Sequence, residues 1–247
     1  MTSLLAPLAV LAAALRPRVL LLARAVVRAL LHLLAPPACV ACDAPSRQGA
    51  TFCAACEATL EPAEGRGGAA PFDEVASGAY RGALAAAVRR FKYGGRPDLA
   101  GPLGARLAAA VRGAGLRGDL VVPVPLHPRK LRERGYNQAA LLAGAVALAA
   151  GARVSARGLL RVRDTTAQAS LSRRGRLDNL DGAFRARSPG AIRGKRVLLV
   201  DDVATTGATL RACAEALLGA GAASVTAVVL ARADAPRPSP GPGARAA

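Results

Sequence analysis

The chain has little aromatic content: among its 247 residues there is no Trp, and there are only four Phe and three Tyr. Because single-stranded nucleic acids stack their bases on aromatic side chains, a surface built from many such platforms is excluded. Acidic residues are also scarce, since 16 Asp and Glu stand against 34 Lys and Arg, and the formal net charge is +18. Most of the basic residues are Arg, as a GC-rich genome would produce. The charge itself still favours polyanions: nucleic acid, phosphorylated metabolites or anionic lipid.

Several common motifs are missing as well. No Walker A sequence occurs, so the chain is not itself a P-loop ATPase. Residues 113–118 match the dinucleotide pattern G-x-G-x-x-G, but they follow an expected helix and precede an expected strand, which is the reverse of the required order. No internal repeat of fixed period is present. The length favours one domain of ordinary size plus a smaller module.

The two ends of the chain differ from its middle. Residues 3–15 are apolar, but they are too short to span a membrane and lack the preceding basic residues of a signal peptide. Within residues 19–34, basic residues recur every fourth position from Arg24 to His32, which predicts an amphipathic helix. Such a helix either packs on the body of the protein or binds a membrane surface peripherally. The C-terminal residues 233–247 are rich in Pro, Gly, Arg and Ala, and we expect them to be disordered.

One stretch carries most of the chemical information. Residues 196–209 combine an apolar strand over Val197–Val200, two adjacent acids, Asp201 and Asp202, and a turn that opens a helix. An unbroken run of Val and Leu is typical of a central parallel strand that is covered on both faces. The acids follow at the carboxyl end of that strand, where open α/β sheets bind ligands. Carboxylates at this place can accept hydrogen bonds from ribose hydroxyls.

The turn after the acids has the composition of an anion site. Its residues are Ala204, Thr205, Thr206, Gly207, Ala208 and Thr209. The first N–H groups of a helix have no intrahelical partner, so together with the helix dipole and the Thr hydroxyls they can bind a phosphate. Gly207 allows the backbone to turn sharply and approach the anion. For any single residue a capped turn is the simpler explanation, but the ordered set favours a sugar-phosphate site.

The cysteines form a second module. Four of the five make two C-x-x-C pairs ten residues apart, Cys39 with Cys42 and Cys53 with Cys56. Two such pairs can place four thiolates around Zn²⁺, and this closed site would be structural. The alternatives are two disulfides, which need an oxidising compartment, or a redox pair, which normally occurs singly. The fifth cysteine, Cys213, is expected to be buried.

The middle of the chain supplies further cations. We expect a strand over 75–80, helices over 81–93 and 98–112, and a strand over 119–124. The basic loop that follows contains Arg129, Lys130, Arg132 and Arg134. A loop at the carboxyl end of a neighbouring strand can supply cations for pyrophosphate, although a solvated basic loop is the alternative. His127 is a weak candidate for a general base, because no carboxylate is placed near it.

A second basic segment spans residues 161–185 and includes Arg163 and Arg176. A loop of this length beside an active site often acts as a mobile cover. It can equally contact a nucleic-acid backbone.

Residues 196–209 closely resemble the signature of type I phosphoribosyltransferases that binds phosphoribosyl pyrophosphate (PRPP), normally with Mg²⁺. The resemblance implies that Asp201 and Asp202 are the catalytic acids and hold the ribose hydroxyls, and that residues 204–209 hold the 5′-phosphate. The cations Arg129, Lys130, Arg132 and Arg134 would then face the pyrophosphate, with Arg163 and Arg176 in the cover. In this class a nucleophile displaces pyrophosphate from the anomeric carbon.

Further motifs resemble the ComF family of bacterial proteins. They are Phe91-Lys92-Tyr93, Val122-Pro-Val-Pro125, Arg132-Glu-Arg-Gly-Tyr-Asn-Gln138, Thr165-x-x-Gln168-x-x-Leu171, Arg176-x-x-Asn179 and Gly182-Ala-Phe184. The resemblance implies an α/β fold, with a type I phosphoribosyltransferase-like parallel sheet flanked by helices and a small N-terminal zinc ribbon with four cysteine ligands. The expected parts are a helical extension (1–34), the ribbon (35–60), the phosphoribosyltransferase-like domain (72–232) and the tail (233–247).

The ComF resemblance also suggests a biological setting. It implies a role in natural competence, the uptake of transforming DNA, with single-stranded DNA and a helicase-like competence protein as partners. The cytoplasm is the expected location, where thiols stay reduced, with peripheral membrane contact through residues 19–34 as a further possibility. No pocket for an accepting nucleophile is recognisable in the sequence. A non-catalytic protein that senses PRPP or binds single-stranded DNA with the same fold is therefore the alternative.

Overall fold

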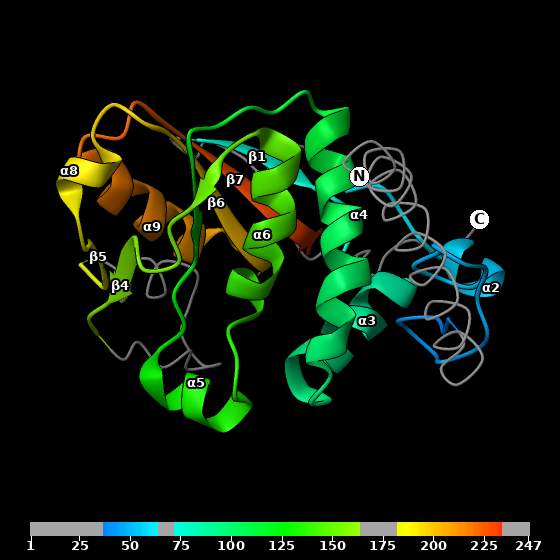
Figure 1. Ribbon diagram of the computed structural model, residues 1–247. Coiled ribbons are helices and arrows are strands. Elements are labelled where there is room, and N and C mark those ends of the chain that lie inside the picture. Colours follow the sequence, from blue (N-terminus) through cyan, green and yellow to red (C-terminus); the bar gives the residue numbers. More distant parts are fainter. Residues whose placement is uncertain (1–36, 64–71, 164–181, 234–247) are drawn as a thin grey trace, which may run out of the picture.

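The computed structural model describes residues 37–63, 72–163 and 182–233 (Figure 1). The expected N-terminal amphipathic helix, the C-terminal tail and most of the second basic segment, including Arg176, lie outside the described residues.

A five-stranded parallel sheet forms the centre of the fold. Its spatial order is β1 (Asp73–Ala76), β7 (Ser224–Arg232), β6 (Arg196–Ala204), β2 (Leu120–Pro123) and β3 (Arg153–Val154). The apolar run of the expected central strand occupies the middle position, because β6 pairs with β7 on one side and β2 on the other. Val197 to Val200 are buried, so the prediction of a central strand covered on both faces is confirmed.

Helices cover both faces of the sheet. One layer consists of α3 (Gly82–Tyr93), α4 (Ala100–Gly113) and α6 (Gln138–Ala150), with the 3₁₀ turn η1 (Pro97–Leu99) between the first two. The other contains α9 (Ala208–Gly219), the short helix α8 (Pro189–Ile192) and the antiparallel pair β4 (Leu159–Arg161) and β5 (Phe184–Ala186). Alternate β6 residues contribute to the two cores, as Leu198 packs in the first and Leu199 in the second. Figure 1 shows α4 and α6 side by side over the sheet.

The cysteine module packs against α3 and α4. It contains the short helix α2 (Ala54–Glu57), and its buried residues Cys39, Val40 and Phe52 belong to the same core as α3. Thr59 Oγ1 accepts a hydrogen bond of 3.0 Å from the N–H of Ala83, in the first turn of α3. The two parts of the described chain therefore share one core.

Three expectations from the sequence differ from the structure. The strand expected over 75–80 is β1, which begins earlier and ends at Ala76. The segment expected to be a basic loop forms helix α5 (Pro128–Arg134). His127 begins it, because its side chain accepts a hydrogen bond from the N–H of Arg129, and Gly135 ends it with a φ of 81°. These two capping residues are the sequence signal that would have predicted the helix. Hydrophobic periodicity could not, because α5 buries no residue. The strand β6 also runs four residues beyond Val200, because its pairing with β7 continues to Ala204.

Within the described residues, the structure contains no helix that combines the length and the apolar character needed to cross a membrane.

Candidate functional site

The two acids lie where β6 loses one of its neighbours. The pairing with β2 ends at Pro123 and Val200, after which the N–H of Val124 donates a last hydrogen bond to the Val200 carbonyl. Beyond this point β6 continues beside β7 alone, so far as the described residues show. Because strand side chains alternate, Asp201 and Asp202 point to opposite faces of the sheet. The strand therefore presents one carboxylate to the α3 side and one to the α9 side.

Asp202 is buried and paired with a lysine from α3. The Nζ of Lys92 lies 2.9 Å from Asp202 Oδ1, and the two side chains are only 19% and 8% exposed. Burial alone would lower the pKa of Lys92, but the attraction of Asp202 and then Asp201 outweighs it, so this pKa is raised. Lys92 was recognised in the sequence only as part of a family motif. Its position at the acids required the tertiary packing of α3 on β6.

Asp201 has an environment that disfavours its charge. Its Oδ1 accepts a hydrogen bond of 2.8 Å from the N–H of Asp202. Burial and the neighbouring Asp202 raise the pKa of Asp201 to about 8, although Lys92 acts in the opposite direction. The protonated form of this carboxyl group is therefore favoured far more than that of an aspartate in water. A cation placed beside it would favour the ionised form.

The turn after the acids has the geometry of a helix start that can bind an anion. Gly207 precedes α9 with a φ of 75°, a conformation that L side chains rarely adopt. Thr206 Oγ1 accepts a hydrogen bond of 3.4 Å from the N–H of Ala208. A small hollow at this place is lined by Asp201 together with residues 203–210. The structure thus brings one of the acids and the whole turn to a single concave surface.

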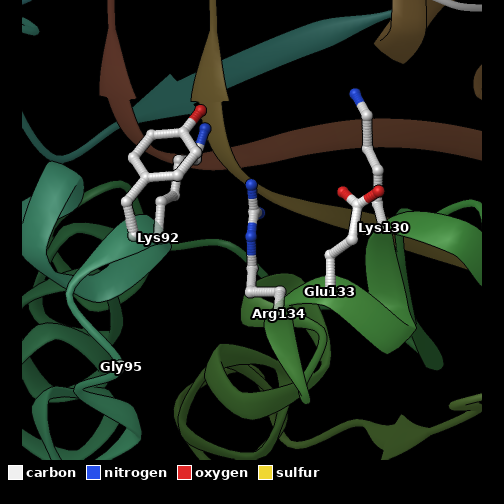
Figure 2. A pocket seen from close by; sticks show the side chains of 6 residues that line it. Lys92, Gly95, Lys130, Glu133 and Arg134 are labelled. Atoms are coloured by element: carbon white, nitrogen blue, oxygen red, sulfur yellow. The ribbon is translucent and has the colours of Figure 1, made fainter.

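The cations of α5 divide between two sides of that helix. Lys130 and Arg134, four residues apart, line a cavity of about 380 Å³, whereas Arg129 and Arg132 are exposed and do not line it. Lys92, Tyr93, Gly95 and Glu133 complete the cavity wall. Figure 2 shows the side chains of Lys130, Glu133 and Arg134 extending from α5 in the same direction, with Lys92 entering from α3. Arg163 is exposed beyond β4 and lines neither hollow.

The segment between α5 and α6 fixes the position of these cations. The Nη1 of Arg134 donates to Gln138 Oε1 at 2.8 Å, and Gln138 is buried. The hydroxyl of Tyr136 donates to the Phe91 carbonyl at 2.5 Å, which ties the segment to the last turn of α3. Asn137 Nδ2 donates to the Val124 carbonyl at 3.0 Å, at the end of β2. These contacts fix the segment after α5 to the last turn of α3 and to the carboxyl end of β2.

The four cysteines of the two pairs form one cluster. Their Sγ atoms all lie within 4.8 Å of one another, with 3.8 Å between Cys42 and Cys53 and 3.6 Å between Cys42 and Cys56. Tetrahedral zinc with Zn–S bonds of about 2.3 Å requires sulfur separations of about 3.8 Å, so the cluster fits this ion. No disulfide joins any of the five cysteines, and Cys213 is buried as predicted. Four thiolates leave no open coordination position, so zinc here would hold the fold together.

Comparisons with known families agree with both parts of the structure. Residues 30–67 match the double zinc ribbon domain, and residues 138–240 match the phosphoribosyl transferase domain. A solved glutamine PRPP amidotransferase from B. subtilis aligns with a TM-score of 0.40 and 25% identity, over 57% of this chain and 30% of that one. The sheet, the domain match and the cysteine cluster define a phosphoribosyltransferase-like protein with an N-terminal zinc ribbon.

Curated relatives narrow this class to one family. DNA utilization protein YhgH from Salmonella typhimurium is 38% identical over 151 residues, which are 59% of this chain and 66% of that protein. Competence protein F from Haemophilus influenzae is 36% identical over 142 residues, 55% of this chain and 62% of that protein. The chain belongs to the ComF family. The matched segments span just under two thirds of these relatives' own length.

Proposed function

We propose that this protein binds PRPP together with Mg²⁺ at the carboxyl end of β6. The observation that carries the proposal is the succession, on one central strand, of two adjacent acids and a glycine turn that opens α9. Asp201 and Asp202 would accept hydrogen bonds from the ribose hydroxyls. The turn over residues 204–209 would receive the 5′-phosphate at the positive end of α9.

The cavity beside the acids suits the other end of PRPP. Lys92, Lys130 and Arg134 bring three cations to its wall, against one acid, Glu133. Pyrophosphate is a polyanion that such cations bind. Arg129 and Arg132 lie outside this wall, so we assign the pyrophosphate contacts to Lys130 and Arg134.

The acids also fit magnesium, because carboxylate oxygens are the ligands that this ion takes from proteins. Bound Mg²⁺ would offset the charge of the pyrophosphate and of the two carboxylates. Asp201 is the better placed of the two for such a role, since Asp202 already pairs with Lys92.

The names of the relatives, DNA utilization protein and competence protein F, support a role of this protein in the handling of DNA. We propose that the protein acts there in the cytoplasm, with single-stranded DNA and a helicase-like protein as partners. The net charge of +18 supports a polyanionic partner. In this setting PRPP is either the donor in a transfer reaction or a sensed metabolite.

Calorimetry with PRPP and Mg²⁺ tests the site. We expect Asp201→Asn and Asp202→Asn each to weaken binding at least tenfold, while Asp119→Asn leaves it unchanged. Asp119 is a matched control because it pairs with Arg196 at the opposite end of β6. Thermal unfolding establishes that each variant is folded. No binding by the unaltered chain, or equal binding by all the variants, would contradict the proposal.

Pyrophosphate release separates the two roles of PRPP. Transfer predicts release when a suitable base or single-stranded DNA is added, and loss of that release in Asp202→Asn. Sensing predicts binding without release from any acceptor.

A further inference from the structure

Tyr93 is the one strongly exposed aromatic residue of the chain. All seven aromatic residues lie within the described ranges. Three Phe rings, those of Phe52, Phe91 and Phe184, are buried, and the rest apart from Tyr93 are half-buried. Tyr93, the last residue of α3, is 75% exposed. A chain with so few aromatic rings therefore presents one of them to solvent, at the rim of its cationic cavity.

The ring is already stacked on one side by a cation. The guanidinium carbon of Arg134 lies 5.0 Å from the centroid of the Tyr93 ring, within the range of a cation–π contact. Arg134 is in turn held by buried Gln138, whose Nε2 has no hydrogen-bond partner among the described residues. Arg134 therefore covers one face of the Tyr93 ring and is itself held in place by Gln138.

The surroundings of this surface leave room for a second ring. Gly95, which also lines the cavity, has a φ of 61°, and apart from its chain neighbours no residue has an atom within 4 Å of the position that a Cβ would occupy. A cavity of about 380 Å³ is within the size range of small-molecule sites. Glu133 on the wall provides an acceptor for ring N–H or amino groups. Lys130 places a positive charge within reach of a phosphate attached to the ring.

Lys92 connects the cavity to the acids, because its side chain lines the cavity and its Nζ lies 2.9 Å from Asp202 Oδ1. We infer that Tyr93 and Arg134 are a stacking platform for a nucleobase, and that the base is carried by a nucleotide, free or in a single strand of DNA. A neutral ring without a phosphate would leave the cations of the cavity without an anion to bind. A phosphate without a ring would leave Tyr93 without a stacking partner. The inference extends the proposed PRPP site, since it places a base beside the ribose-binding acids.

Matched oligonucleotides separate stacking from charge. The full chain would be titrated with a short fluorescent single strand of thymidine nucleotides and with an abasic strand of the same length, at one fixed salt concentration. We expect Tyr93→Ala to weaken binding of the thymidine strand about 5- to 150-fold, the range for loss of one stacked base. Its affinity for the abasic strand should be unchanged. Tyr93→Phe should keep the affinity of the unaltered chain.

Free thymidine monophosphate, measured by calorimetry, identifies the source of the base. Binding of the mononucleotide that is as tight as that of the strand, and lost in Tyr93→Ala, assigns the platform to a free nucleotide. Tyr93-dependent binding that appears only with the strand assigns it to DNA. Leu148→Ala, which alters an exposed side chain on α6, serves as the control and should change nothing. Equal effects of Tyr93→Ala on thymidine and abasic strands, or no effect on either ligand, would overturn the inference, whether or not PRPP binds.

Discussion

At the scale of single residues, the site is unusual for the charges that it buries. A carboxylate and an ammonium group out of water are each costly, and only their mutual attraction makes the burial of both tolerable. Lys92 and Asp202 satisfy this condition across two elements, α3 and β6. Asp201, one residue away, forms no such ion pair within the described part of the chain. Its pKa is raised because burial and the nearby Asp202 disfavour its charge. The two acids are therefore chemically distinct even though they are adjacent in the sequence.

Removing Lys92 should be strongly destabilising, because it leaves Asp202 buried without its counter-charge. We expect Lys92→Met to lower the free energy of unfolding by about 3–5 kcal/mol in urea denaturation. Adding Asp202→Asn to this variant should restore more than half of the loss. Arg89→Met, on the exposed side of the same helix, is the control and should stay within about 0.5 kcal/mol. A double variant no more stable than Lys92→Met would argue against the pairing.

The raised pKa of Asp201 makes the ligand-free protein less stable as pH rises. The folded-state pKa of about 8 lies above the ordinary value of 3.8, so the folded state retains a proton that the unfolded state has already lost. The contribution of this carboxyl group to the free energy of unfolding is therefore greatest below the unfolded-state pKa. It is lost as the pH rises from that value to the folded-state pKa, by at most about 1.4 kcal/mol per pH unit. Between about pH 5 and pH 8, the free energy of unfolding of the unaltered chain should therefore fall relative to that of Asp201→Asn, which has no proton to lose at this position. Parallel curves for the two proteins would contradict this assignment.

At the scale of elements, helix α3 connects the cysteine cluster to the site. The Nη1 of Arg90 donates to the Val40 carbonyl at 3.1 Å, and its other amino group pairs with Asp43, beside the ligand Cys42. Two residues further on, Lys92 contacts Asp202. Opposite sides of one helical turn thus hold the ribbon and the acid.

Arg90 and Arg89 form a matched pair of variants for this connection. Arg90→Ala removes two contacts to the ribbon and should lower the free energy of unfolding by about 1–3 kcal/mol. Arg89→Ala, on the exposed side, should change it by less than about 0.5 kcal/mol. Urea denaturation measures both. Equal stabilities for the two variants would show that the ribbon does not depend on Arg90.

Much of the site could be predicted from the sequence where local order determines the geometry. The strand, acids and glycine turn over residues 196–209 are contiguous, so their arrangement follows from local rules. The same holds for the two cysteine pairs, whose spacing permits one cluster. Lys92 and Tyr93 could not be placed in this way, because about 110 residues separate Lys92 from Asp202 and only tertiary packing joins them. Helix α5 could not be predicted from hydrophobic periodicity, because its sequence has capping residues at both ends but no regularly spaced apolar residues.

At the scale of the whole molecule, ribbon and sheet domain depend on each other. Cys39, Val40 and Phe52 pack in one core with α3 and α4, and Thr59 caps α3 through Ala83. The domain is therefore expected to lose packing when the ribbon loses its metal.

Metal removal tests this dependence. We expect about one zinc per chain by metal analysis of the reduced protein, and a single thermal transition. A chelator should lower the midpoint of the whole transition by at least several degrees, since each kcal/mol shifts it by about 2–4 °C for a chain of this size. Protein without zinc, or a sheet domain that melts at the same temperature after chelation, would contradict the shared core.

The proposed function requires the carboxyl end of β6 to bind a phosphoribosyl group. A crystal structure of the full chain with PRPP and Mg²⁺ is its most direct measurement. We expect the 5′-phosphate on the backbone N–H groups of residues 206–209, with the ribose hydroxyls at Asp201 and Asp202. A structure in which PRPP contacts only the cations of α5 and leaves this turn without a phosphate would contradict it.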